Sequence, residues 1–354
     1  MFGTSGIRGP VGETVTADLA LSVGRALAVD AERVVVGRDP RESGQFLADA
    51  LAAGLRESGT GVVRLGLAST PTIARAVAWQ GADAGVSVTA SHNPPEDNGI
   101  KLWQPSGQAF DGPLREAITA RIESGAFEPA SWDAVGRSSH WNARKRHVEA
   151  IVDAVSPDPE LSVVVDVGNG AGGLTADALV ELGCDAQTLN AQPDGVFPGR
   201  PSEPTLEHCS TLRAMVADSD ADLGIAHDGD ADRMVAVTGD GEYVAGDLLL
   251  ALFARNAIEM DDARDAVEMD EFDGNSDAHS PSPRVAVPVD TSLVVADTVE
   301  TAGGDVAYTP VGDVHVADAA SQERFVFGGE PSGAWIWPDE TLAPDGHYAA
   351  LHLA

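Results

Sequence analysis

The sequence predicts an α/β fold with mixed, mostly parallel sheets flanked by helices. Two observations predict it: short apolar runs that end in polar loops, and amphipathic stretches that follow these runs. Single runs lie in "ERVVVGRDP" (32–40) and "LSVVVDVGNGAGG" (161–173), and a pair of runs encloses an acidic loop in "DLGIAHDGDADRMVAVTGDG" (222–241). Buried parallel strands have this continuous apolar character, so the pattern indicates consecutive α/β units.

Each further element follows from a local pattern. Residues 43–59 and 174–183 space their apolar side chains as helices do, directly after the first two single runs. "GVSVTA" (85–90) is typical of a strand, and residues 344–354 have the spacing of a helix that is just beginning. "DVGNGAGG" (166–173) lacks the lysine of a nucleotide-binding loop, so we expect a tight turn there. Function should therefore concentrate in the loops at the strand ends.

The length and polar stretches of the chain predict three domains. A chain of 354 residues is long enough for two or three cores. Residues 127–147 lose helical periodicity, and a second break lies near residues 245–247. We therefore expect domains at 1–140, 141–246 and 247–354. Within the third, residues 259–284 are acidic and then rich in serine and proline, which predicts a partly disordered surface insertion.

The charge of the chain excludes some partners. It has 56 acidic against 22 basic residues, and the net charge is −34. The electric field of so negative a chain repels nucleic acid and anionic membrane surfaces, so neither is expected as a partner. A solvated acidic surface suited to a cytosol of very high salt explains the balance, because salt screens the self-repulsion. Two cysteines give no disulfide framework and no apolar leader precedes the first strand, so we expect a cytoplasmic protein.

Three aspartates in "HDGDADR" (227–233) are the sharpest chemical signal. Asp228, Asp230 and Asp232 alternate with small residues, so their carboxylates can converge on one hard cation. Three carboxylates suit Mg²⁺, whereas a full calcium cage would need more ligands. The alternative is a structural turn in a chain rich in aspartate. However, the loop lies between two apolar runs, where unpaired carboxylates would be costly, so we predict a metal site.

The stretch "VTASHNPPEDNGIK" (88–101) is the second signal. Ser91 follows a predicted strand in a loop that two prolines stiffen, and a serine needs activation to act as a nucleophile. A nearby magnesium site makes phosphorylation of Ser91 attractive, because the metal would balance the phosphate charge. Lys101, one of two lysines, could act as a base if burial lowered its pKa. Alone, this stretch would be read as an ordinary loop.

Two glycine-rich pieces complete the set. In "FGTSGIRG" (2–9), Arg8 could bind a phosphate. In "GGEPSG" (328–333), Glu330 and Ser332 could form hydrogen bonds with sugar hydroxyls. Each piece alone is equally well explained as a structural turn.

Together, "FGTSGIRG", "TASHNP", "DGDADR" and "GGEPSG" occur in an order and with a chemistry that resembles the α-D-phosphohexomutases. The resemblance implies three related α/β domains, bearing in turn the phosphoserine, the metal and the sugar-binding loop, and a hexose phosphate as substrate. It implies Ser91 as the phosphoserine, Mg²⁺ as cofactor, and a hexose 1,6-bisphosphate intermediate. It implies metal ligands at Ser91, Asp228, Asp230 and Asp232. It also implies catalytic roles for Lys101, His92 and Arg8, and substrate contacts at Arg233, Glu330, Ser332, Gly312 and Asp313.

The resemblance leaves several alternatives open. The family has a fourth, phosphate-gripping domain, which we expect to be absent here. The opening motif is more similar to phosphoglucosamine mutases, so glucosamine phosphate is the expected sugar, with glucose or mannose phosphate as the alternative. A truncated, inactive remnant that binds sugar phosphate is the second alternative, and a phosphatase using Asp228 as nucleophile is the third. Either a monomer or a homodimer is compatible with the sequence.

Overall fold

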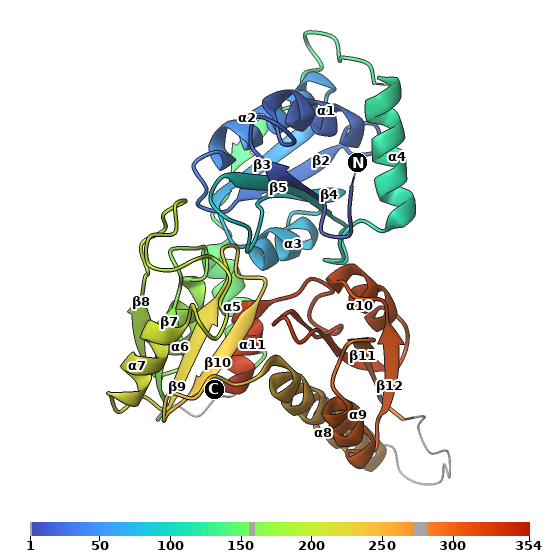
Figure 1. Cartoon of the computed structure of the whole chain (residues 1–354). Coiled ribbons are helices and arrows are strands. Elements are labelled where there is room, and N and C mark those ends of the chain that lie inside the picture. Colours follow the sequence, from blue (N-terminus) through green and yellow to red (C-terminus); the bar gives the residue numbers. More distant parts are fainter. Residues whose placement is uncertain (1, 126, 156–159, 272–281) are drawn as a thin grey trace.

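The computed structural model describes residues 2–125, 127–155, 160–271 and 282–354, and it contains three α/β domains (Figure 1). Each domain has a mixed sheet that is mostly parallel, with helices against it. The predicted fold class is therefore confirmed. No described helix has the length and apolar character needed to cross a membrane.

The first domain contains a six-stranded sheet of order β1-β5-β4-β2-β3-β6. The sheet is parallel from β4 through β2 and β3 to β6, and β1 and β5 run antiparallel to their neighbours. Its elements are β1 (Ile7–Pro10), α1 (Ala17–Leu27), β2 (Arg33–Arg38), α2 (Gly44–Glu57), β3 (Gly61–Leu67), α3 (Thr70–Trp79), β4 (Ala84–Val88), β5 (Asp97–Trp103), α4 (Gly112–Ser124) and β6 (Ser138–His140).

The second and third domains each contain a four-stranded sheet, of orders β10-β9-β7-β8 and β12-β11-β13-β14. The second comprises α5 (Arg144–Asp153), β7 (Ser162–Asp166), α6 (Leu174–Glu181), β8 (Asp185–Leu189), α7 (Ser210–Ala217), β9 (Leu223–His227) and β10 (Met234–Thr238). The third comprises α8 (Gly246–Glu271), β11 (Arg284–Pro288), α9 (Leu293–Thr301), β12 (Asp305–Thr309), α10 (Asp313–Ala320), β13 (Phe325–Gly329) and β14 (Trp335–Ile336), and α11 (Gly346–Leu353) follows it.

One strand order is repeated in all three domains. The first strand of each repeat is central and parallel to the second and third, and a fourth strand pairs antiparallel with the third. The central strands β2, β7 and β11 carry the valine-rich apolar runs "VVV", "VVV" and "VAV", whose side chains are buried. Burial on both faces of the sheet explains why these strands are continuously apolar rather than alternating.

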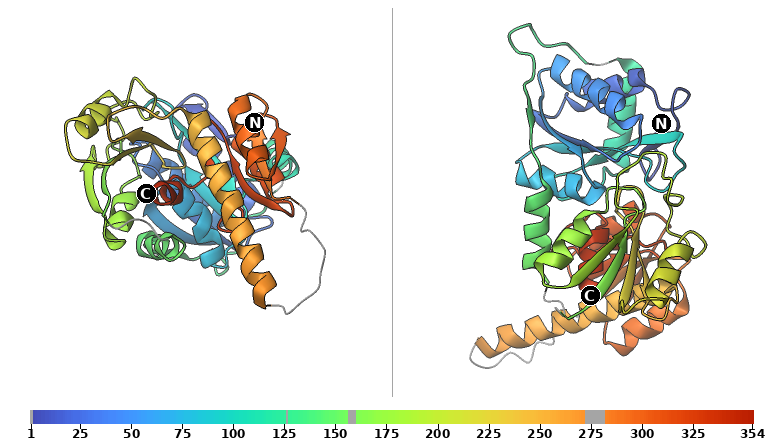
Figure 2. Two further views of the ribbon diagram at one scale, coloured as in Figure 1. Left: turned by 90° about the horizontal axis from the view of Figure 1, so that it is seen from below. Right: turned by 90° about the vertical axis from the view of Figure 1, so that its left-hand side faces the viewer.

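Two segments differ in detail from the expected organisation. Residues 259–271 continue α8 as a helix, because "EMDDARDAVEMDE" is rich in good helix formers, so this part of the predicted insertion is ordered. Figure 2 shows this helix extending beyond the rest of the molecule. The remainder of the predicted insertion includes residues 272–281, which lie outside the described residues. Helix α11 packs against α5, α6 and β10 of the second domain, although it follows the third in sequence.

Candidate active site

Three of the four motifs meet because the three repeats place their loops alike. In each repeat a loop joins the third strand to its antiparallel partner: residues 89–96 between β4 and β5, 228–233 between β9 and β10, and 330–334 between β13 and β14. These are the loops that contain Ser91, the three aspartates, and Glu330 with Ser332. One structural position, used three times, therefore supplies most of the site.

The three domains enclose a cavity of about 320 Å³ at this point. Most of its polar wall was predicted from sequence, including Arg8, Ser91, Lys101, Asp232 and Arg233. The remaining lining residues are Thr4, Ser5, Pro288, Asp290, Val311, Gly312, Asp313, Glu330, Pro331, Ser332 and Ala334. A cavity that gathers cations, carboxylates and hydroxyls from three domains is suited to a polar, anionic small molecule.

Ser91 lies where its own loop, residues 89–96, meets residues 228–233, the predicted metal loop. Its side chain is 1% exposed, and its Oγ donates a hydrogen bond of 2.6 Å to Asp228 Oδ2. His92 Nδ1 lies 3.3 Å from Ser91 Oγ. The backbone of Ser91 is left-handed, with φ of 52°, which is uncommon for a residue other than glycine. Such local strain persists only where surrounding contacts enforce it.

Arg41, which the sequence analysis missed, provides those contacts. Its fully buried guanidinium donates hydrogen bonds to four backbone carbonyls of this loop region, those of Ser91, Asn93, Pro94 and Asp97, at 2.5–2.9 Å. Asp39 accepts from Arg41 Nε at 3.0 Å and from Thr89 Oγ1 at 2.7 Å. Burial raises the pKa of Asp39 to about 6, although Arg41 opposes the shift. Arg41 therefore fixes the path of the loop that presents Ser91.

Replacing Arg41 with lysine is expected to destabilise the fold and to disturb the position of Ser91. An ammonium has three donors and cannot reproduce the planar fork, so the free energy of unfolding should fall by about 3 kcal/mol. Urea unfolding measures this loss. Arg38→Lys is the matched control, because Arg38 lies three residues before Arg41, at the end of β2, and is partly exposed. Equal stability of the two variants would contradict the role assigned to Arg41.

The three aspartates converge as their spacing predicted. One oxygen from each carboxylate lies within 4.8 Å of the others, and the side chains are at most 5% exposed. Asp230 Oδ1 and Asp232 Oδ1 are buried and have no hydrogen-bond partner within the described part of the chain. Thr70, at the start of α3, donates to Asp230 Oδ2 at 2.6 Å. Hard oxygen donors that lack partners fit a hard cation such as Mg²⁺.

The electrostatics of the aspartates favour a bound cation. Burial, together with Asp232 and Asp230, raises the pKa of Asp228 well above its ordinary value. Burial and Asp230 raise the pKa of Asp232 to about 6. Ionised carboxylates this close repel one another in a medium that screens poorly, so a divalent ion would relieve the repulsion.

A second buried arginine, Arg200, holds the strand that leads into the predicted metal loop. Arg200 donates to Asp166 Oδ2 at 2.6 Å and to the carbonyl of His227 at 2.5 Å, directly before Asp228. Asp39 directly follows the first strand of its repeat, and Asp166 ends the first strand of the next. An arginine paired with one of these aspartates therefore holds each of the two loops, at the same level of the fold. The sequence "GRDPR" (37–41) places Asp39 and Arg41 two residues apart, so the first pair could have been predicted from it. No comparable pattern near Arg200 indicates its pairing with Asp166.

Lys101 has a charge partner, Asp313, that the sequence did not indicate. Its Nζ lies 2.5 Å from Asp313 Oδ2 and 4.6 Å from the ring centre of Trp103. Burial alone would raise the pKa of Asp313, but Lys101 outweighs that effect and holds it below its ordinary value. The two groups thus form an ion pair of ammonium and carboxylate.

The predicted sugar loop contacts the start of α10. Gly312 N donates to Glu330 Oε1 at 2.8 Å, and Ser332 Oγ donates to Glu330 Oε2 at 3.3 Å. Gly312 has φ of 128°, a conformation that favours glycine. Burial and the neighbouring Asp313 raise the pKa of Glu330. Gly312, Asp313, Glu330 and Ser332 are therefore one connected group in the cavity wall.

The remaining predicted residues supply positive charge and an uncharged imidazole. Arg8 lines the cavity from β1. Arg233 lies beside Glu203, with a nitrogen–oxygen distance of 3.6 Å, and its backbone N–H donates to Asp228 Oδ1 at 3.2 Å. Burial, followed by the charges of Arg233 and Arg8, lowers the pKa of His92 to about 3. His92 is thus a neutral ring at neutral pH.

Comparisons with known proteins agree with this architecture. The chain matches the phosphoglucomutase/phosphomannomutase α/β/α domain I over residues 1–129, domain II over 145–241 and domain III over 245–354. A probable phosphoglucosamine mutase of Methanosarcina barkeri is 44% identical over 355 residues, covering 100% of this chain and 76% of that protein. One of Methanopyrus kandleri is 46% identical over 357 residues, covering 99% and 75%.

A solved structure gives the same result. The phosphoglucomutase/phosphomannomutase family protein of Burkholderia thailandensis superposes with a TM-score of 0.85 at 31% identity, covering 100% of this chain and 76% of that one. The family matches over three domains and the relatives above 40% identity all indicate the same family. The chain belongs to the phosphoglucomutase/phosphomannomutase family.

Proposed function

We propose that the protein is a phosphohexomutase that interconverts hexose 6-phosphate and hexose 1-phosphate through a phosphorylated Ser91. One observation carries the proposal: the Ser91 hydroxyl lies 2.6 Å from an aspartate of a buried three-carboxylate cluster, beside a cavity lined by Arg8, Lys101 and Arg233. A serine in this setting can carry a phosphoryl group whose charge is balanced on both sides.

The metal ion in this proposal is Mg²⁺, held by Asp228, Asp230, Asp232 and the phosphate on Ser91. When bound, it would neutralise the charge of the phosphoryl group. The unpartnered carboxylate oxygens of Asp230 and Asp232 support this assignment.

The other residues of the site transfer the proton and bind the phosphate and the sugar. The phosphoryl group passes to a hydroxyl of the hexose phosphate, so the Oγ–P bond breaks and a sugar O–P bond forms. The Lys101–Asp313 pair transfers the proton that the sugar hydroxyl loses to Ser91 Oγ. Arg8 and Arg233 bind phosphate oxygens, and Glu330 with Ser332 accepts hydrogen bonds from sugar hydroxyls. The bisphosphate reorients, and its other phosphate returns to Ser91.

Glucosamine phosphate is the substrate that we infer. The two archaeal relatives described above are named probable phosphoglucosamine mutases, and they align with nearly the whole of this chain. Glucose or mannose phosphate is the alternative, because the family and the Burkholderia protein carry those names.

A substrate panel tests the proposal. The protein, with Mg²⁺ in concentrated KCl, receives glucosamine, glucose or mannose 6-phosphate and a trace of the matching 1,6-bisphosphate, and ³¹P NMR follows the 1-phosphate. We expect glucosamine 1-phosphate to form fastest and inorganic phosphate not to accumulate. Hydrolysis to inorganic phosphate would indicate a phosphatase. No conversion by folded protein that binds Mg²⁺ would indicate a sugar-phosphate-binding remnant.

A further inference from the structure

The charged side chains of the site cavity are divided between the domains. The first two domains supply its cations, which are Arg8, Lys101 and Arg233. The charged side chains that the third domain adds to the wall are all carboxylates, namely Asp290, Asp313 and Glu330. The cavity is therefore suited to a ligand that carries an anionic group at one end and a positive charge at the other.

Of the four carboxylates that line the cavity, three already have partners or another role. Asp232 belongs to the three-aspartate cluster, and Asp313 Oδ2 is paired with Lys101 Nζ at 2.5 Å. Glu330 accepts hydrogen bonds from within the third domain with both of its oxygens. Asp290 is different: it is exposed, and its carboxylate forms no hydrogen bond or ion pair with any described residue. One negative charge on the wall is thus available to a ligand.

The first repeat shows what an aspartate at this position does elsewhere in the fold. Asp39 and Asp290 each lie three residues after the apolar run of the first strand in their repeat. Asp39 is 1% exposed, and its carboxylate accepts hydrogen bonds from Arg41 and Thr89. Where the first repeat has Arg41, two residues after the aspartate, the third repeat has Ser292. The arginine that would pair with Asp290 is therefore missing, and its carboxylate faces the cavity unpaired.

Asp290 also lies beside the residues that we assign to the sugar hydroxyls. The strands β12, β11 and β13 are parallel and adjacent in this order. Gly312, Asp290 and Glu330 follow their carboxyl ends in turn, so Asp290 lies between the other two along the edge of the sheet. Neighbouring strands are about 4.8 Å apart, a distance that one hexose ring spans. A hexose whose hydroxyls contact Glu330 can thus place a neighbouring ring substituent against Asp290.

Glucosamine phosphate has the distribution of charge that this wall fits. Its primary amine is mostly protonated at pH 7, so the sugar carries an ammonium as well as a phosphate. Glucose and mannose phosphate have an uncharged hydroxyl at the same carbon. Arg8 and Arg233 can bind phosphate oxygens while an unpaired carboxylate of the third domain balances the ammonium.

We propose that Asp290 binds the ammonium group of glucosamine phosphate and thereby selects this sugar over glucose and mannose phosphate. The inference deepens the proposed function and rests on it, because it assigns the substrate preference of the same site to one residue. Asp290 acts on specificity: it contacts the sugar and takes no part in the transfer of the phosphoryl group or the proton.

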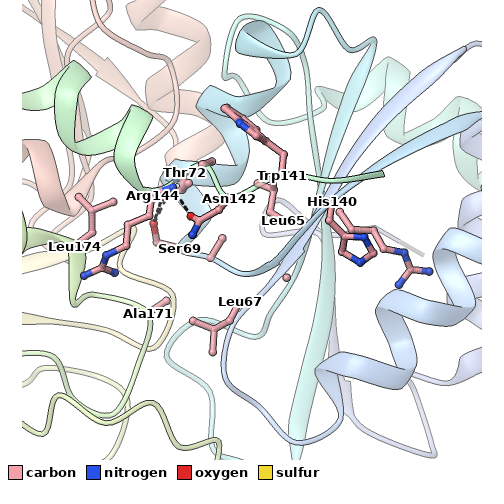
Figure 3. Close-up of a pocket in the computed structure, with 14 residues that line it drawn as sticks. Leu65, Leu67, Ser69, Thr72, His140, Trp141, Asn142, Arg144, Ala171 and Leu174 are labelled. Atoms are coloured by element: carbon pink, nitrogen blue, oxygen red, sulfur yellow. Dashed lines mark hydrogen bonds between the residues drawn. The ribbon is translucent and has the colours of Figure 1, made fainter. Parts of the chain in front are cut away.

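Another large cavity offers no such group to an amino sugar. It has a volume of about 360 Å³ and lies between the first two domains, where Trp141 and Arg144 line it (Figure 3). The guanidinium of Arg144 is already paired with Asp177, and none of the described residues that line this cavity is a carboxylate. An effect of Asp290 on the binding of glucosamine phosphate would therefore report on the site cavity.

Calorimetric titration of the full-length protein tests the proposal without turnover. Glucosamine 6-phosphate and glucose 6-phosphate are titrated at pH 7 with Mg²⁺, in the same salt and with no bisphosphate added. Asparagine keeps the shape of the side chain and removes its charge, so Asp290→Asn should weaken the binding of glucosamine 6-phosphate by about 10-fold or more. Its affinity for glucose 6-phosphate should stay nearly unchanged.

Asp305→Asn is the matched control. Asp305 is an exposed carboxylate at the start of β12, at the opposite edge of the same sheet, and it does not line the cavity. This variant loses the same charge from the same domain and should bind both sugars as the original protein does.

The outcomes separate this inference from the proposed function. Equal weakening of both sugars by Asp290→Asn would overturn the inference, because Asp290 would then bind a group that the two sugars share. Unchanged affinity for glucosamine 6-phosphate would overturn it as well. An original protein that binds neither sugar phosphate would contradict the proposed function and the inference together.

Discussion

Replacing Ser91 with alanine is expected to lower kcat/KM for hexose phosphate isomerisation by about four orders of magnitude or more. The Ser91 hydroxyl is the group that reaches the aspartate cluster, at 2.6 Å from Asp228, so its loss removes the oxygen that carries the phosphoryl group. Steady-state kinetics in concentrated salt, with Mg²⁺ present, gives the effect.

Ser91→Gly is the matched variant for stability. Ser91 has a left-handed backbone, which alanine adopts at a cost and glycine adopts freely. Both variants should lack activity, but the glycine variant should be more stable than the alanine variant by about 1 kcal/mol. Appreciable turnover in either variant would contradict a phosphoserine mechanism.

Replacing Asp228 with asparagine is expected to abolish Mg²⁺ binding and activity and yet to stabilise the metal-free protein. The change removes one of three mutually repelling buried carboxylates while keeping the shape of the side chain. Thermal unfolding with and without Mg²⁺ measures both effects. We expect the original protein to gain stability with Mg²⁺ and the variant to gain none. Asp218→Asn, at an exposed helix end, is the control.

The same carboxylates predict a pH dependence. The pKa of Asp232 is raised to about 6 in the fold, above its value of about 3.9 in the unfolded chain. The folded state therefore binds this proton more tightly, and the stability that it provides is lost as pH rises from about 4 to about 6. That loss amounts to about 3 kcal/mol without metal. Mg²⁺ should stabilise the protein more at pH 7 than at pH 4, and the reverse order would contradict a metal site here.

Much of the fold and site was predictable because it depends on local pattern. The apolar runs at 34–36 and 163–165 form central strands, and the acidic loop lies between two strands as expected. Ser91 and the three aspartates could be named because few motifs combine such residue types at such spacing. The structure adds that one loop position, repeated in three domains, brings them together.

The supporting contacts could not be predicted, because they join residues far apart in sequence. Arg41 contacts a loop about 50 residues away, and His347 is bonded to Ser69, 278 residues before it. No local pattern distinguishes such a buried histidine from an ordinary core residue. The partner of Lys101, Asp313, likewise lies 212 residues away, so no local pattern indicates this ion pair. Long-range polar contacts of this kind decide the electrostatics of the site.

Peptide mass spectrometry of Ser91 tests the central claim most directly. Full-length protein with Mg²⁺ in concentrated salt is incubated with a hexose 1,6-bisphosphate, desalted, and then exposed to glucosamine 6-phosphate. We expect the peptide that contains Ser91 to gain one phosphate and to lose it to the sugar. A Ser91 that stays unmodified in folded, Mg²⁺-bound protein would contradict the proposed mutase mechanism.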